Sequence, residues 1–169
     1  MFEKRDGERV LEDDPAVADG DGHVIFIGHI ESPWTERKEC PRNLTRARET
    51  GQMARVVISE AFRPGLSGLE GATHVILLTW LHHSPRNLIV QHPRHASEAK
   101  GVFALRSPAR PNPVGLHAVR VLHLEPEAGI LDIDAIDVLD GTPVIDIKPY
   151  IPAIDAVPDA RTGRAGTSP

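Results

Sequence analysis

The chain has 169 residues, of which 40% are hydrophobic and 25% are charged, and its formal net charge is −5 at pH 7. This length and composition predict one globular domain with a full core, and the negative charge argues against binding nucleic acid through bulk charge alone. The single cysteine, the lack of a long apolar run and the charged N-terminus lead us to expect a cytoplasmic protein without an internal disulfide, a membrane segment or a secretory signal.

The first half of the chain alternates turn signals with short apolar runs. Residues 1–20 carry many charges without periodicity, and we expect a tail that is mobile or docked. The run Val24-Ile25-Phe26-Ile27 predicts a first buried strand, and the basic stretch 33–55 predicts either a ligand-facing loop around Pro41-Arg42-Asn43 or a solvated loop. Further on we expect a strand over 53–62, a short helical turn over 66–73 and a central strand over 74–81.

The second half of the chain predicts more short strands. Residues 84–100 are polar and predict a long loop, and strands are expected over 101–105, 117–125, 130–138 and 144–148. The alternation within 130–138 changes phase at Ala135-Ile136, which predicts a β-bulge. Together these features predict an all-β fold over 21–158, mainly an antiparallel β-barrel with one or two short helices, followed by a C-terminal tail over 159–169.

The stretch Arg110-Pro111-Asn112-Pro113-Val114-Gly115-Leu116 predicts a stiff loop. Its prolines hold Arg110 and Asn112 out of the helical region, and Gly115 permits a sharp exit. Such a loop would present a guanidinium and a carboxamide to a small polar ligand, and the alternative is a structural turn. The stretch Pro41-Arg42-Asn43 has a similar character. If Arg110 acts on a ligand, we expect Arg110→Ala to weaken activity far more than fold stability.

Four histidines lie in or beside one predicted loop: His82, His83, His92 and His95. Their spacing matches no zinc motif, so we expect no metal site. His82 or His83, at the end of a strand, is better suited to hydrogen bonding or general-base catalysis, and the alternative is an ordinary loop histidine. Asp140-Gly141-Thr142 predicts either a tight turn or a carboxylate that accepts hydrogen bonds from vicinal hydroxyls such as those of a ribose.

Five stretches together resemble one known family. They are IGHIESPW (27–34), PRN (41–43), GLEGATHVILLTWLHH (68–83), GVFALRSPARPNPVGL (101–116) and LDGTPVIDIKPYIP (139–152). In them the chain is similar to the TsaA-like, or TrmO, family of tRNA N6-threonylcarbamoyladenosine methyltransferases, over most of residues 23–158. The resemblance implies a dimeric β-barrel enzyme that uses S-adenosylmethionine to methylate threonylcarbamoyladenosine next to the tRNA anticodon. The chain looks like a short form without the extra C-terminal domain, which leaves a different small substrate as an alternative.

The cofactor-binding pattern of the family carries over residue by residue. It implies that the cofactor contacts Pro41, Arg42, Asn43, His82, His83, Arg106, Leu116, Asp137, Leu139, Asp140, Gly141 and Thr142. Two of these depart from the pattern, because Asn43 replaces the usual glutamine and His83 stands where the family often has glutamine. Both residues keep a hydrogen-bonding group, so we expect cofactor binding to survive.

Methyl transfer to the implied acceptor nitrogen requires alignment with the methyl group and removal of a proton. We assign these tasks to His82, Arg110, Asn112, Lys148 and Tyr150: Arg110 and Asn112 would hold the loop or the acceptor, and the other three would handle the proton. A basic patch could contact phosphate through Arg42, Arg46, Arg48, Arg86, Arg94 and Arg110. Two alternatives are a regulatory module that binds S-adenosylmethionine without turnover and a plain RNA-binding barrel, which the scarcity of aromatic residues disfavours.

Overall fold

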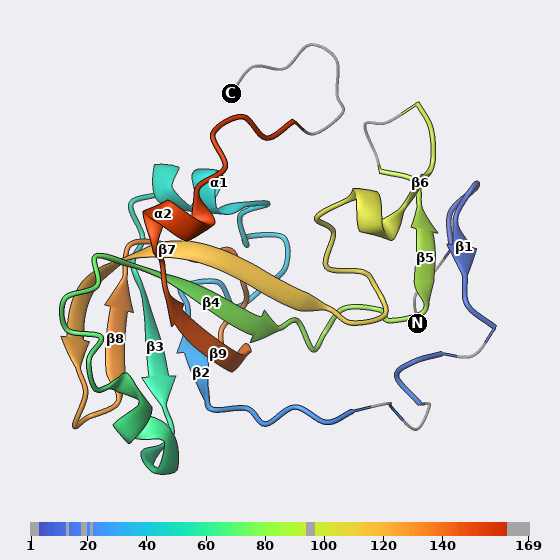
Figure 1. Cartoon of the computed structure of the whole chain (residues 1–169). Coiled ribbons are helices and arrows are strands. Elements are labelled where there is room, and N and C mark those ends of the chain that lie inside the picture. Colours follow the sequence, from blue (N-terminus) through green and yellow to red (C-terminus); the bar gives the residue numbers. More distant parts are fainter. Residues whose placement is uncertain (1–3, 13, 18–19, 21, 94–96, 162–169) are drawn as a thin grey trace.

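The computed structural model describes residues 4–12, 14–17, 20, 22–93 and 97–161. Most of them build a closed antiparallel barrel with the strand order β2-β3-β8-β7-β4-β9 (Figure 1). Its strands are β2 Gly28–Glu31, β3 Ala54–Ile58, β4 His74–Trp80, β7 Val114–Glu125, β8 Ile130–Ile133 and β9 Pro143–Pro149. The predicted antiparallel β-barrel is therefore confirmed.

Side chains that alternate along each strand fill the barrel interior. In β4, Val75, Leu77 and Thr79 are fully buried, whereas Ile76 and Leu78 face outward and keep part of their surface exposed. Every barrel strand contributes an aliphatic side chain to one apolar core, which includes Ile30, Val56, Leu77, Val119, Leu131 and Val144. The strands predicted over 74–81, 117–125 and 144–148 are confirmed as β4, the greater part of β7, and β9.

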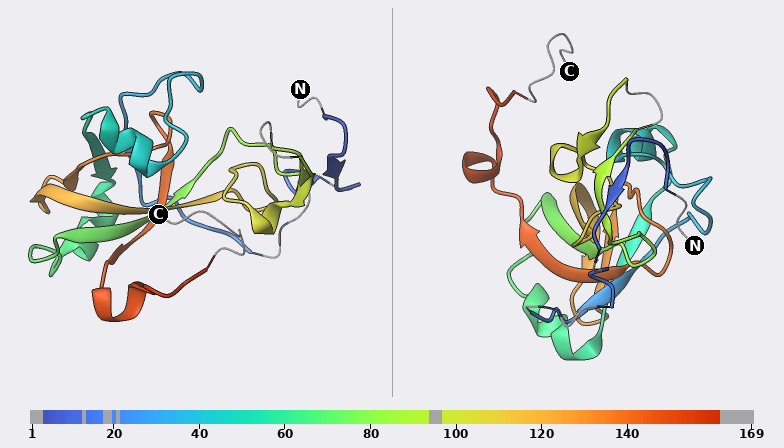
Figure 2. Two further views of the ribbon diagram at one scale, coloured as in Figure 1. Left: turned by 90° about the horizontal axis from the view of Figure 1, so that it is seen from above. Right: turned by 90° about the vertical axis from the view of Figure 1, so that its right-hand side faces the viewer.

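A second, smaller sheet stands beside the barrel (Figure 1). It has the order β1-β5-β6, with β1 Arg9–Val10, β5 Leu88–Gln91 and β6 Lys100–Gly101. The view from above in Figure 2 shows it extending away from the barrel, with the segments before β5 and after β6 running between the two sheets. Leu88, Val102 and Ala109 form its core. We call residues 84–113, which carry β5 and β6, the arm.

The N-terminal segment docks onto the arm. Glu8 is almost fully buried, and its carboxylate accepts hydrogen bonds from Arg5 and from the backbone N–H of His92. Strand β1 then pairs with β5. The extents predicted for the two tails remain predictions, and residues 162–169 lie outside the described part of the chain.

Four short helices complete the fold: α1 Leu44–Glu49, a 3-10 helix Glu60–Leu66, a 3-10 helix Val102–Ala104, and α2 Pro152–Asp155. A solvated loop, one of the two alternatives for 33–55, does not describe the whole stretch, because α1 begins within it after the N-cap residue Asn43. The 3-10 helix Glu60–Leu66 cuts short the strand predicted over 53–62 and precedes the turn predicted over 66–73.

The predicted buried strand at 24–27 was also wrong. Val24, Ile25 and Phe26 are 52%, 69% and 44% exposed, and β2 begins only at Gly28. The ladder between β2 and β3 ends at the pair Gly28↔Ile58, because β3 stops there. Ile27 still donates to the carbonyl of Val144 in β9, whereas Val24, Ile25 and Phe26 lie outside every strand.

Three further predictions fail between residues 84 and 138. The expected long loop 84–100 contains β5, and the expected strand 101–105 is mostly a 3-10 helix. The strand expected over 130–138 ends at Ile133, so the predicted bulge at Ala135-Ile136 is absent. Instead, the chain leaves the sheet and buries Ala135, Ile136 and Val138 against the core. The register shift in this pair of strands lies in β7, between Val121 and His123.

Candidate functional site

The loop Asp137–Thr142, which leads into β9, is held firmly against the end of β2. Asp140 N–H donates to the carbonyl of Trp34 at 2.8 Å, and its Oδ1 accepts from Ser32 N–H at 2.9 Å. Gly141 N–H donates to the backbone of β2 at 2.8 Å, with a φ of 74° that favours glycine. The Asp140 Oδ2 atom accepts no hydrogen bond from another described residue and is exposed. The loop is therefore rigid but keeps one carboxylate oxygen available.

The loop Pro41–Asn43 lies close to the loop Asp137–Thr142. Cys40, directly before it, is half-buried, and burial together with the negative charge of Asp137 raises the pKa of its thiol to about 11. Such an electrostatic effect requires proximity, because it weakens with distance and with solvent screening. Cys40 and Asp137, which are far apart in the sequence, thus lie near enough for the charge of Asp137 to act on the thiol. The thiol stays protonated at neutral pH, where it is a poor nucleophile.

Asn43 and Arg42 each keep groups that a ligand can use. Asn43 Oδ1 accepts from Arg46 N–H at 2.9 Å and so caps α1. Its side-chain NH2 group makes no hydrogen bond to another described residue. The guanidinium of Arg42 is exposed and likewise has no partner among the described residues. The carboxamide that replaces the family's glutamine therefore also has a structural task.

A buried chain of polar groups connects the loop Asp137–Thr142 to the barrel interior. His117 Nδ1 lies 2.8 Å from Asp137 Oδ1, and His117 Nε2 lies 2.9 Å from Thr79 Oγ1. His117 is 4% exposed and Thr79 is 0% exposed. Because a carboxylate only accepts hydrogen bonds, Nδ1–H of His117 donates to Asp137 and, in the neutral ring, Nε2 accepts from the Thr79 hydroxyl. The chain fixes the orientation of the Asp137 carboxylate.

The sequence analysis missed this chain, although a signal was present. His117 and Thr79 occupy inward positions of β7 and β4, where the alternation demands apolar side chains. Gly115 belongs to the same arrangement. A Cβ at this position would lie 2.3 Å from Thr79 Oγ1 and 2.5 Å from His117 Nε2. The prediction that Gly115 provides a sharp exit was wrong, since it lies within β7 and leaves room for these two side chains.

The loop before β7 does not present Arg110 to a ligand. The Arg110 guanidinium points inward and donates to the backbone carbonyls of Ser107 at 2.8 Å, Val102 at 2.9 Å and Leu105. Asn112 is exposed, and its backbone carbonyl accepts from Val114 N–H. This geometry corresponds to the structural turn, the alternative to a ligand-binding loop, with Arg110 as the residue that holds it.

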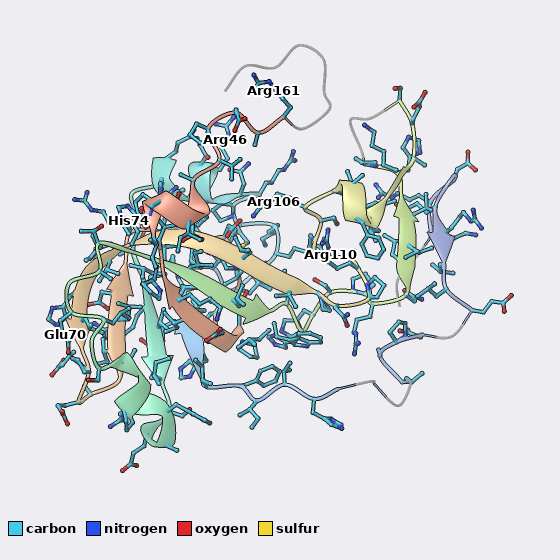
Figure 3. All side chains as sticks on the ribbon, viewed as in Figure 1. Arg46, Glu70, His74, Arg106, Arg110 and Arg161 are labelled. Carbon is cyan, nitrogen blue, oxygen red and sulfur yellow. The ribbon has the colours of Figure 1, made fainter. Side chains whose placement is uncertain are left out.

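Four other predicted cofactor residues lie on or near the outer surface of β4 and β7. Arg106 donates to the carbonyl of Leu116 at 3.2 Å, and Leu116 is 49% exposed. The rings of His82 and His83 follow the end of β4, with centroids 3.8 Å apart. Partial burial and the neighbouring His83 lower the pKa of His82. Figure 3 labels Arg106 and Arg110, both on the segment between the arm's sheet and β7.

The residues predicted to handle a proton are not brought together within one chain. Lys148 Nζ pairs with Asp146 Oδ2 at 2.7 Å on β9. Tyr150 N–H donates to the carbonyl of His74, where β4 begins. His82 follows the opposite end of β4, and a seven-residue strand spans about 20 Å. Tyr150 and His82 thus lie near opposite ends of this strand.

The predicted basic patch is largely engaged in internal contacts. Arg46 pairs with Glu49 and Arg48 with Asp134, while Arg86 donates to the carbonyl of Pro111 and lies 5.3 Å from the ring centroid of Trp80. Arg110 holds its own loop. Arg94 and His95 lie outside the described residues. Of the described members, Arg42 alone has no described partner.

Comparison with known proteins identifies the family. Residues 29–156 match the family described as the tRNA-methyltransferase O N-terminal domain, TrmO_N. The chain belongs to this family. A crystal structure of TrmO superimposes with a TM-score of 0.70 at 38% identity, covering 85% of this chain and 64% of that one. The TrmO-like barrel is thus shown by sequence and by structure.

Relatives of the TrmO_N domain carry two kinds of name. The "Probable S-adenosyl-L-methionine-binding protein VirR" of Rhizobium radiobacter is 37% identical over 144 residues, which cover 83% of this chain and 79% of that protein. The tRNA (adenine(37)-N6)-methyltransferase of Escherichia coli is 33% identical over 149 residues, which cover 85% of this chain and 63% of that enzyme. The chain spans less than two thirds of that enzyme.

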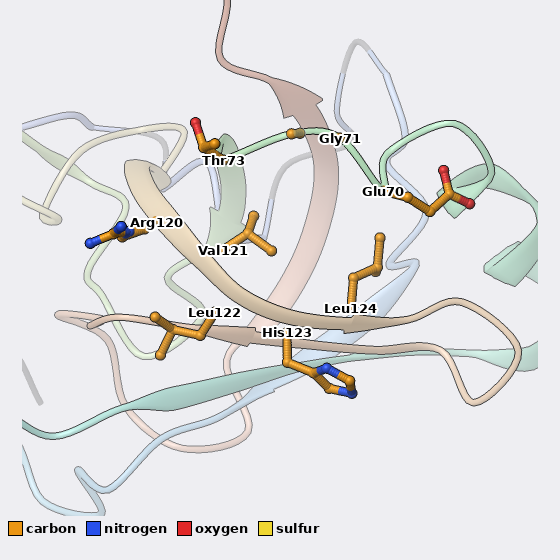
Figure 4. Close-up of a pocket in the computed structure, with 9 residues that line it drawn as sticks. Glu70, Gly71, Thr73, Arg120, Val121, Leu122, His123 and Leu124 are labelled. Carbon is orange, nitrogen blue, oxygen red and sulfur yellow. The ribbon is translucent and has the colours of Figure 1, made fainter.

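Two open grooves lie away from the two loops of this TrmO_N domain. One of about 380 Å3 is lined by residues 70–73 and 120–124 (Figure 4). The other, of about 500 Å3, includes Tyr150 and Arg48. The loops Pro41–Asn43 and Asp137–Thr142 contribute no residue to either groove, and we base the candidate site on the hydrogen bonds and electrostatics described above.

Within the described residues, no group of His, Cys, Asp and Glu is arranged to hold a metal ion, and no helix is long and apolar enough to cross a membrane.

Proposed function

We propose that this chain is an S-adenosylmethionine-dependent methyltransferase that acts on the threonylcarbamoyladenosine next to the tRNA anticodon. The observation that carries the proposal is the geometry of the loop Asp137–Thr142, whose backbone is fixed by hydrogen bonds while Asp140 is exposed and keeps one carboxylate oxygen without a partner among the described residues. The family resemblance assigns this loop and the loop Pro41–Asn43 to the cofactor. The name of the Rhizobium relative supports the cofactor, and the name of the Escherichia coli relative supports a tRNA adenine as the acceptor. A tRNA substrate also fits the cytoplasmic location expected from the sequence.

The chemistry of these two loops fits S-adenosylmethionine, which carries a ribose diol, a carboxylate and a cationic sulfonium. Asp140 Oδ2 is available to accept hydrogen bonds from the diol, and open space around the Cα of Gly141 permits close approach. The guanidinium groups of Arg42 and Arg106 suit the carboxylate. The negative charges of Asp137 and Asp140 favour a nearby cation. When bound, the cofactor supplies a methyl group on positively charged sulfur.

The protein's own residues have to align the acceptor nitrogen and accept its proton. His82 suits the second task, because its lowered pKa leaves the imidazole neutral and able to accept a proton at pH 7. Arg110 and Asn112 contribute indirectly by holding the segment that leads into β7. The ion pair with Asp146 keeps Lys148 at the surface of β9. We therefore assign the proton to His82 ahead of Lys148 and Tyr150.

We further propose that two copies of the chain form the working enzyme. The side chains assigned to the cofactor lie on both sides of one barrel wall, since Asp137 contacts the inward-facing His117, whereas Leu116 faces outward from β7. The outer face of this wall carries exposed apolar side chains, with Val114 at 40% and Leu116 at 49%. A second copy against this face would cover them and bring a second set of loops to Leu116. Sedimentation should show a dimer for the wild type and a monomer for Val114→Glu, and a monomeric wild type would contradict the dimer.

The test of the reaction uses the purified protein, unmodified and threonylcarbamoylated tRNA, and S-adenosylmethionine with a labelled methyl group. After digestion to nucleosides, mass spectrometry should find the label on threonylcarbamoyladenosine only. Asp140→Asn should remove the activity, while Arg161→Ala, an exposed arginine at the C-terminal side of α2, should not. Cofactor binding without transfer to tRNA would instead favour a regulatory module, the reading that the name of the Rhizobium relative also permits.

A further inference from the structure

The groove that contains Tyr150 collects groups that the proposed cofactor site does not use. It has a volume of about 500 Å3 and lies at the start of β4, where α1, β7 and the segment after β9 meet. Its lining includes Arg48, His74, Arg120, Asp134 and Tyr150. It shares the lining residues Thr73 and Arg120 with the groove of Figure 4, so open grooves lie on both sides of these residues. Open grooves of this kind suit an extended chain better than an enclosed small molecule.

The wall of the groove is fixed before any ligand arrives. Arg48 Nε donates to Asp134 Oδ2 at 2.7 Å, and its NH2 group donates to the carbonyl of Ala118 at 2.9 Å. Asp134 Oδ1 accepts from Arg120 N–H at 2.8 Å. On the other side, Tyr150 N–H is bonded to the carbonyl of His74 at 3.0 Å. Binding here would therefore cost little ordering of the backbone.

Three side chains in the groove are left to contact a ligand. Arg120 and His74 are direct cross-strand partners on β7 and β4, and both are exposed. The Arg120 guanidinium and the Tyr150 hydroxyl form no hydrogen bond with another described residue. Tyr150 is the single tyrosine of the chain and is half-buried in the groove wall. A guanidinium and an aromatic ring that line one groove provide for one anionic group and one planar group, which is the chemistry of a nucleotide.

We propose that this groove binds a nucleotide of the single-stranded RNA loop that carries the methyl acceptor, with its base on the Tyr150 ring and its phosphate at Arg120. The inference rests on the proposed function for the choice of RNA. The placement agrees with that choice, because Asp134 is three residues from Asp137, at most about 11 Å along the chain. One RNA loop can thus reach the groove and the cofactor loops together.

The experiment measures the binding of a fluorescein-labelled RNA hairpin with a single-stranded loop by fluorescence anisotropy at several salt concentrations. Arg120→Gln should weaken binding about tenfold at low salt and reduce the slope of log Kd against log salt by about 0.7, the value for one lost single-strand phosphate contact. Tyr150→Leu should weaken binding about tenfold, and Tyr150→Phe should bind like the wild type, because stacking needs only the ring. Arg9→Gln, which removes an exposed strand arginine from β1, is the matched control and should change the salt slope less than Arg120→Gln.

The affinity for S-adenosylmethionine, measured by calorimetry in the same proteins, separates this proposal from the proposed function. We expect it to be the same in all four variants as in the wild type. RNA binding that is unchanged in Arg120→Gln and Tyr150→Leu, or absent from the wild type, overturns the groove proposal and leaves the cofactor site standing. Wild type that binds RNA through Arg120 but does not bind S-adenosylmethionine overturns the proposed function and keeps the groove as an RNA site.

Discussion

The loops Asp137–Thr142 and Arg110–Pro113 look alike in sequence, since each combines a charged residue with turn-forming neighbours, yet they use that residue in opposite ways. Backbone groups and side chains of the segment after β2 hold the first loop, so one oxygen of Asp140 stays available. The second loop is held by its own charged side chain, because Arg110 donates to three carbonyls. A charged residue in a stiff loop is thus a candidate ligand group only where other groups fix the backbone.

The largest effect that follows from this comparison is on stability. Arg110→Ala removes three hydrogen bonds and leaves three carbonyls without a partner. At about 1 kcal/mol per bond, we expect a loss of about 3 kcal/mol, or about 6 to 12 °C in melting temperature. Differential scanning calorimetry measures this, with Arg106→Ala, which loses one bond, as the control. The sequence analysis expected the opposite, namely that activity falls far more than fold stability. An unchanged melting temperature together with lost activity would show that Arg110 contacts the ligand.

The next effect concerns the buried chain behind the loop Asp137–Thr142. His117→Gln keeps an amide near the position of Nε2 but loses the hydrogen bond to Asp137, whereas His117→Asn places its amide near Nδ1 and retains that bond. We expect the glutamine variant to bind S-adenosylmethionine about ten- to a hundredfold more weakly, the value of one hydrogen bond to a charged group, and the asparagine variant to bind more tightly than the glutamine variant. The affinity of each variant for S-adenosylmethionine is measured by calorimetric titration, after circular dichroism has shown that the variant is folded. Equal affinity in both variants would mean that the chain serves the core alone.

A smaller effect is expected at the helix cap. Asn43→Ala should lower stability by about 1 kcal/mol, or about 2 to 4 °C, because α1 loses its N-cap acceptor. Asn43→Asp keeps the cap and should melt near the wild type, while Asn43→Gln should melt like the alanine variant. If all three variants melt like the wild type, Asn43 would have no structural task and would serve the ligand alone.

The smallest change is a local one, in the reactivity of Cys40. Burial and the charge of Asp137 raise the pKa of its thiol to about 11, so only about one thiol in a thousand is ionised at pH 8. Alkylation by iodoacetamide should therefore be slow at pH 8 and speed up as the pH approaches 11. Asp137→Asn removes one of the two causes, lowers the pKa and should speed alkylation a few-fold at pH 9. No change in rate would show that the two loops do not meet in solution.

The sequence predicted a strand correctly where the alternation of buried and exposed side chains extends over many residues. Strands β4 and β7 are long and alternate regularly, so period-2 reasoning located them. Strand β5 has four residues and β1 and β6 have two each, too few for any periodicity to register. The run 24–27 misled for a different reason, because apolar composition does not say whether an opposing strand exists.

The candidate site, too, could be predicted from the sequence only in part. The family pattern named the two loops that we propose for the cofactor, but it could not show that Asn43 also caps a helix or that Arg110 points inward, since both follow from which backbone atoms lie nearby. His117 and Thr79 were readable as polar residues at inward strand positions. The hydrogen bond between His117 and Asp137 could not be predicted from the sequence, because it depends on residues 134–138 leaving the sheet and folding back along β7.

The most direct test of the cofactor site is the calorimetric titration of S-adenosylmethionine into the wild type, into Asp140→Asn and into Arg161→Ala. We expect saturable binding by the wild type and the Arg161 control, and a large loss of affinity in Asp140→Asn without a change in melting temperature beyond that of the control. Binding that is unaffected by the Asp140 substitution, or absent from a folded wild type, would contradict the central claim that the loops Pro41–Asn43 and Asp137–Thr142 form the cofactor site.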